Sequence, residues 1–139
     1  MQTSVAVANA RLDAFEAAVG ASGRLQMWGG AIPASTTATP AGAKLVEIAL
    51  AADWMAPAAN RSKSLSGVPL ATTALAAAGA APGTTITFYR FTDTAGTTCH
   101  WQGPVTATGA GGEMTVDNPT VVSGQALNVT GYTIAEGGA

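Results

Sequence analysis

Residues 84–92 read TTITFYRFT, and after the turn DTAG at residues 93–96 the chain continues as TTCHWQ over residues 97–102. Both runs are rich in threonine, aromatic and β-branched residues, which favour extended strands. Asp93 is suited to begin the turn because its side chain can accept backbone N–H groups, and Gly96 tolerates a positive φ. The stretch therefore predicts a β-hairpin.

Further strand patterns lie on both sides of this hairpin. Upstream, residues 24–28 (RLQMW) alternate in polarity, and residues 44–50 (KLVEIAL) are short and contain a β-branched pair that favours strand over helix. Downstream, residues 113–116 and 126–134 are separated by glycine, proline and asparagine. Short strands spaced about ten residues apart with such breaks are typical of sandwiches and jelly rolls. The sequence predicts a mostly β, β-sandwich or jelly-roll-like domain.

Three segments are less regular. Residues 53–68 contain Pro57, Asn60 and Gly67 between isolated apolar residues, which indicates an irregular loop with short strands. Residues 72–79 (TTALAAAG) stay open, because alanine favours helix while the glycines and proline that follow leave little room for one. Residues 109–112 (GAGG) predict a flexible hairpin tip.

An N-terminal α-helix is predicted from the spacing of apolar residues after Ser4. These residues alternate in steps of three and four, as one face of a helix requires. Thr3 or Ser4 can cap the first turn, and Gly20 suits the left-handed position after the last turn. We therefore expect two parts, an N-terminal helix with a flexible exit in residues 1–22 and a β-sandwich domain in residues 23–139.

The apolar stripe of this helix is the predicted assembly interface. It is too short for a coiled coil and too narrow for a typical core helix, so docking on a partner is favoured. The other face of the helix is expected to carry Asn9, Arg11, Asp13 and Glu16. The stripe consists of Val5, Ala8, Leu12, Phe15 and Val19.

The composition points to contacts between neutral surfaces. Charged residues make up 10% of the 139-residue chain and the net charge is −2. The six basic residues are scattered, so no nucleic-acid partner is expected. No long apolar run and no signal peptide are visible, which predicts synthesis in the cytoplasm and no membrane partner. A surface with so little charge favours self-association into a homo-oligomer.

The sequence offers little for catalysis. Cys99 is the only cysteine and His100 the only histidine, and neighbours in a strand point to opposite faces, so they cannot form a dyad. Asp93 and Asp117 fall at turns, where an aspartate caps its own backbone. The acids have no metal-ligand spacing. No catalytic residue, cofactor or metal site is predicted.

The aromatic residues have two interpretations. Trp28, Trp54, Trp101 and Tyr89 are expected mainly in the core, since a sandwich needs large side chains inside. Alternatively, exposed rings among them could stack on the apolar faces of a sugar. The second interpretation predicts a glycan platform.

Several short motifs resemble a group of tailed-bacteriophage virion proteins of similar size. These motifs are an N-terminal helix with Asn, Leu and Ala, a strand ending in aromatic-x-Gly before a proline, a LLAEI.L-like strand and a β-rich second half. They correspond to residues 9–14, 25–30 with Pro33, 44–50, 83–91, 94–97, 102–103 and 123–127. The CHW sequence at residues 99–101 departs from the plainer strand expected there.

The resemblance implies a virion structural protein without catalytic motifs, made in the cytoplasm of a bacterial host. The leading hypothesis is a capsid decoration or cement protein that binds the major capsid protein or another virion protein as a homo-oligomer, a dimer or trimer. The alternative is a tail or fibre module that binds a host glycan or another tail protein.

Overall fold

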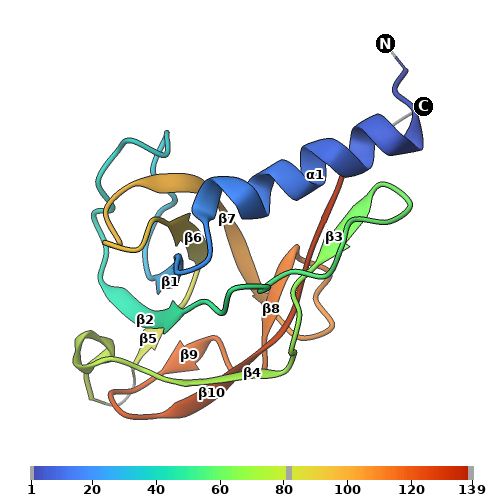
Figure 1. Cartoon of the computed structure of the whole chain (residues 1–139). Coiled ribbons are helices and arrows are strands. Elements are labelled where there is room, and N and C mark those ends of the chain that lie inside the picture. The colour runs from blue at the N-terminus through green and yellow to red at the C-terminus, as the bar shows by residue number, and fades with distance from the viewer. Residues whose placement is uncertain (1, 81–82, 138–139) are drawn as a thin grey trace.

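The computed structural model describes residues 2–80 and 83–137 and shows one helix lying across a strand-rich body (Figure 1). The helix and the short 3₁₀ turn are α1 (Val5–Val19) and η1 (Ala76–Ala78). The strands are β1 (Arg24–Trp28), β2 (Lys44–Ala49), β3 (Ser62–Ser64), β4 (Leu70–Thr73), β5 (Thr84–Thr85), β6 (Phe88–Thr92), β7 (Cys99–Ala107), β8 (Met114–Val116), β9 (Thr120–Val121) and β10 (Ala126–Ala135).

Most strands belong to one curled, mixed sheet. Its order is β2-β1-β6-β7-β8-β10-β3, and β4 also pairs with β10. The strands β5 and β9 form a separate two-stranded pair. The sheet curls into a half-barrel around the apolar core, and α1 runs along one side of it (Figure 1). The predicted mostly β, sandwich-like fold with one N-terminal helix is confirmed.

The predicted hairpin is present as β6 and β7. The two strands are antiparallel, and Phe91 lies opposite Trp101 in the register. The carboxylate of Asp93 caps the turn, because its Oδ1 accepts hydrogen bonds from the backbone N–H groups of Thr97 and Thr98 at 2.9 and 3.2 Å. The strand begins later than expected, since the segment before Phe88 leaves the sheet and pairs with β9 instead.

Aromatic side chains form the centre of the core. Phe91 packs against both Trp54 and Trp101, with a ring-centroid distance of 4.8 Å to each, and the two indoles lie 6.0 Å apart. Trp101 Nε1 donates a hydrogen bond of 2.7 Å to the hydroxyl of Tyr132, and the hydroxyl of Tyr89 donates to the same oxygen. The interpretation of the tryptophans as core residues therefore holds for Trp54 and in part for Trp101.

The glycine-rich segment at residues 109–112 is not the tip of a hairpin, so that expectation was wrong. The strands on either side of it, β7 and β8, pair in parallel, with Val105 opposite Met114. Gly109 and Gly111 have φ values of 87° and 84°, which only glycine adopts readily, and they let the chain loop back within a few residues. Residues 72–79, for which the sequence did not decide between helix and other structure, contain the end of β4 and the short turn η1.

The ends of α1 match the predicted signals. The Ser4 side chain accepts a hydrogen bond from the backbone N–H of Val7 at 3.3 Å, and Gly20 has a φ of 82°. Gly23 follows in a crowded position, since a Cβ there would lie 2.9 Å from the carbonyl oxygen of Thr92. The end of the helix is thereby packed against the sheet. No helix in the described part of the chain is long and apolar enough to cross a membrane.

Candidate functional site

The polar side of α1 faces the chain's own β domain. Lys63 of β3 is buried, with 2% of its side chain exposed, and its Nζ lies 2.7 Å from Asp13 Oδ1 and 3.0 Å from Glu16 Oε2. Burial by itself lowers the pKa of Lys63, but hydrogen bonds to the two carboxylates outweigh that effect and raise it. Two helix carboxylates thus neutralise one buried cation.

The same side of the helix also satisfies backbone groups in residues 55–61. Glu16 Oε1 accepts the N–H of Met55 at 3.0 Å, and Asp13 Oδ1 accepts that of Ala58 at 3.1 Å. Asn9 Oδ1 accepts the N–H of Arg61 at 3.0 Å. Of the polar residues expected on the other face of the helix, Asn9, Asp13 and Glu16 therefore bind the β domain, because these backbone N–H groups need acceptors.

The structure divides the predicted apolar stripe. Ala8, Leu12 and Val19 are buried within the single chain. Val5 and Phe15 remain 47% and 38% exposed. Of the five predicted interface residues, three therefore contribute to the chain's own packing and two are open to a partner.

The outward face of α1 is almost entirely apolar. The two exposed charged residues of the helix, Arg11 and Asp13, are both paired within the chain, with Glu136 and Lys63. A helix face in water usually carries several charges. The exposed apolar residues are Val5, Ala6, Val7, Ala10, Ala14, Phe15, Ala17 and Ala18; together they are called the outer face of α1 below.

A cleft of about 560 Å³ lies beside this face, between α1, β7 and the end of β10. The ring of Phe15 meets the ring of Trp101 edge to face, with a centroid distance of 4.9 Å. Ile134 adds apolar surface, and Tyr89 and Glu113 also line the cleft. The outer face of α1 and this cleft form one continuous region that pairs apolar surface with a few polar groups.

The residues considered for nucleophilic chemistry do not converge. Cys99 lines a pocket near the β6–β7 turn, whereas His100 lines a shallow hollow beside Phe15 and Ala18. This separation agrees with the alternation expected for a strand. Within residues 2–80 and 83–137, no group of three or more His, Cys, Asp or Glu side chains could hold a metal ion.

The predicted turn aspartates act as caps. Asp117 accepts hydrogen bonds from the backbone and the side chain of Asn128 at 2.9 and 2.7 Å. These bonds lower the pKa of Asp117 below its usual range, and the Thr97 and Thr98 bonds do the same for Asp93. Both carboxylates are thus committed to local structure.

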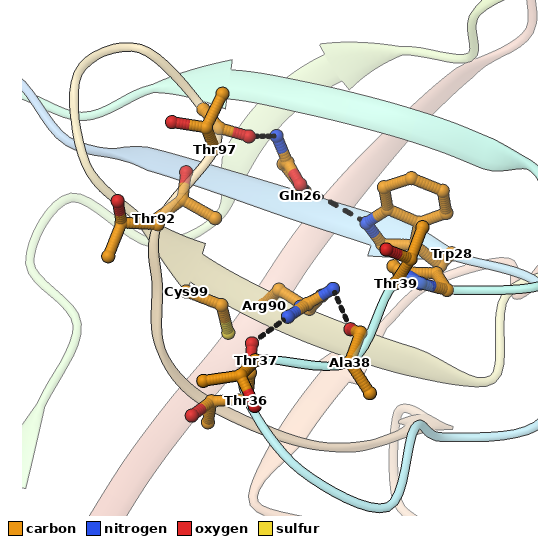
Figure 2. Close-up of a pocket in the computed structure, with 13 residues that line it drawn as sticks. Gln26, Trp28, Thr36, Thr37, Ala38, Thr39, Arg90, Thr92, Thr97 and Cys99 are labelled. Carbon is orange, nitrogen blue, oxygen red and sulfur yellow. Dashed lines mark hydrogen bonds between the residues drawn. The ribbon is translucent and has the colours of Figure 1, made fainter.

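A polar pocket that was not predicted from the sequence lies on the other side of the sheet (Figure 2). Its volume is about 380 Å³, and Gln26, Arg90 and Thr92 form its floor. Gln26 and Arg90 lie opposite each other in adjacent strands, so both point away from the aromatic core. The available signal was Arg90 itself, a charged residue within an aromatic strand.

A long loop over residues 29–43 forms the roof of this pocket. Arg90 donates hydrogen bonds to the carbonyl oxygens of Thr36 and Ala38 (Figure 2). Gln102 Nε2 donates another, of 2.7 Å, to the carbonyl oxygen of Pro33. The loop, although rich in turn residues, is therefore fastened to the sheet at three carbonyls.

Comparisons of the chain with protein-family models, with curated proteins and with solved structures gave no match. Functional proposals for this chain consequently depend on its own residues and geometry.

Proposed function

We propose that the chain is a non-enzymatic structural protein of a phage particle that decorates and stabilises the capsid as a homo-oligomer. Its partner is the major capsid protein or another virion protein. The resemblance of the sequence motifs supports the assignment to a phage particle. The low charge supports extended contacts between neutral surfaces. One structural observation carries the assembly role, namely the apolar outer face of α1.

This face is held in place before any partner binds. Asn9, Asp13 and Glu16 fix the opposite side of α1 to the β domain. They accept three hydrogen bonds from the backbone N–H groups of Met55, Ala58 and Arg61, and Asp13 and Glu16 form two ion pairs with Lys63. A partner would therefore meet a surface that is already ordered, which reduces the entropy lost on binding. The alanines allow a close approach of the partner's backbone.

The size of the face indicates how it would contribute. A helix of 15 residues is about 22 Å long, which is too small to supply the roughly 800 Å² per partner of a stable interface. The adjoining cleft with Phe15 and Trp101 enlarges the contact area. Many copies on a symmetric shell would then add avidity to individually modest contacts.

The test is binding of purified protein to particles that lack it, measured by co-sedimentation. We expect Ala14→Glu to reduce binding at least about tenfold, since it places an unpaired charge in an apolar interface. Ala77→Glu, at an exposed position in η1, serves as the matched control and should bind like the original chain. Equal binding by both variants would show that the outer face of α1 is not the binding surface.

The number of copies of the protein per particle distinguishes a capsid location from a tail location. Quantitative mass spectrometry of particles that contain the protein should give a number comparable to that of the major capsid protein. A number as low as that of a tail ring would contradict capsid decoration and favour the tail alternative. Absence from purified particles would contradict both.

A further inference from the structure

The two most buried cations of this fold are treated differently. Lys63 has two carboxylates within 3.0 Å, as described above. Arg90 is 6% exposed, and among the described residues no carboxylate lies within the 4.0 Å of an ion pair. Its hydrogen bonds go to the carbonyl oxygens of Thr36 and Ala38, and its Nε is buried without a partner. A buried charge of this kind is normally paired.

The carboxylates of Glu47 and Asp93, on β2 and in the β6–β7 turn, are engaged in other contacts. Glu47, next to Gln26 across β1 and β2, accepts hydrogen bonds from Lys44, Gln26 and Arg24 at 2.7, 2.9 and 3.2 Å. Asp93 caps the β6–β7 turn. The pocket therefore has an uncompensated positive charge at its floor and space for an anionic group above it.

The walls of the pocket are suited to a hydroxylated ligand. The indole of Trp28 lines one side, and its Nε1 donates to Gln26 Oε1 at 3.3 Å (Figure 2). An aromatic ring can stack on the apolar face of a sugar. A volume of about 380 Å³ is at the lower end of ordinary ligand pockets. The hydroxyl-bearing residues around it are Thr36, Thr37, Thr39, Thr92, Thr97 and Thr98.

We propose that this pocket binds one carboxylated sugar unit, whose carboxylate pairs with the guanidinium of Arg90. In this arrangement the sugar hydroxyls meet threonine hydroxyls and one face of the ring lies against Trp28. Guanidinium and carboxylate form strong, directional hydrogen bonds. This inference does not depend on the particle assignment, so either can fail alone.

The single cysteine provides a site-specific readout. Cys99 lines the pocket and is partly exposed, so a bound sugar should slow its alkylation by the neutral reagent iodoacetamide. Glucuronic acid, galacturonic acid and N-acetylneuraminic acid are the probes. Glucose and galactose lack the carboxylate, and acetate lacks the ring. We expect a slowing of at least about fivefold with at least one acidic sugar and none with the controls.

Variants test the contacts separately. Arg90→Lys keeps the charge but loses the planar pair of donors, and should weaken protection at least about tenfold. Because Arg90 also holds the 29–43 loop, Thr39→Val is a second variant, since its hydroxyl makes no hydrogen bond among the described residues. It should weaken protection without changing thermal stability.

Two outcomes would overturn the proposal. Equal alkylation rates with acidic sugars, neutral sugars and buffer would show that no such ligand binds. Equal protection by acetate and by the acidic sugars would show an anion site without sugar recognition. Comparing a free uronic acid with a uronic-acid oligosaccharide then distinguishes a soluble ligand from the end of a polysaccharide.

Discussion

The Nζ atom of Lys63 lies 2.7 Å from Oδ1 of Asp13, which joins β3 to α1 across 50 positions of sequence. Because Lys63 is buried, this contact and the neighbouring one to Glu16 decide which side of the helix faces inward. The polar side docks on the β domain beside the buried Ala8, Leu12 and Val19, while the remaining apolar residues of α1 stay at the surface. The inward side of α1 thus combines a short apolar stripe with polar groups that bind the β domain.

Replacing Lys63 with methionine should release the helix from the β domain. The change leaves Asp13 and Glu16 without their cation, and we expect a loss of about 2–3 kcal/mol in the free energy of unfolding. Lys44→Met is the matched control, because Lys44 pairs with Glu47 at a more exposed position; it should cost less than about 1 kcal/mol. Chemical denaturation measures both, and similar losses would contradict the docking role of Lys63.

The same ion pair should make the stability of the fold depend on pH in the acid range. The hydrogen bond from Lys63, followed by that from the Ala58 N–H, holds the pKa of Asp13 below its ordinary value of 3.8. A carboxyl whose pKa is lower in the folded state stabilises the fold above its unfolded pKa, and this contribution is lost as the pH falls through the folded pKa. The stability difference between the original chain and Asp13→Asn should therefore shrink below about pH 4. A difference that stays constant down to acid unfolding would argue against the pair.

The two tyrosines of the chain should resist ionisation. Burial raises the pKa of Tyr132 to about 12, and burial together with the nearby Tyr132 and Glu113 raises that of Tyr89 as well. Both groups stay neutral in the fold above their ordinary value, so their contribution to stability is complete below pH 10 and is lost as the pH rises further. Phenolate absorbance should stay low in the native chain near pH 10 but reach half its maximum there in concentrated guanidinium. A native curve that matches the unfolded one would contradict the buried tyrosine pair.

Gly42 should tolerate no side chain. A Cβ at this position would lie 1.8 Å from the backbone carbonyl oxygen of Gly29, so the base of the 29–43 loop would have to move. We expect Gly42→Ala to cost about 1–3 kcal/mol and to disturb the roof of the Arg90 pocket. Gly137→Ala is the control, because nothing lies within 4 Å of its Cβ position. Calorimetry should find the control unchanged, and an unchanged Gly42→Ala would show that the loop is not closed at this point.

Local sequence determined the hairpin, the ends of α1 and the aspartate caps. In β6 and β7 the alternation of side chains and the turn residues 93–96 act over a few positions, so the pattern alone carries the information. The same holds for Ser4 and Gly20 at the helix ends, whose hydrogen bond and dihedral angle are local properties.

Tertiary structure alone decided that the polar side of α1 also docks on the β domain, and where Arg90 lies. The periodicity of α1 identified its apolar stripe, of which Ala8, Leu12 and Val19 are buried. It could not show that Lys63 and the N–H groups of Met55, Ala58 and Arg61 find their acceptors on the adjoining polar side. Similarly, Arg90 became the floor of a pocket only because residues 36–38, more than 50 positions away, fold over it. A buried charge or N–H group must find its partner wherever the fold provides one, and that choice is made by groups distant in sequence.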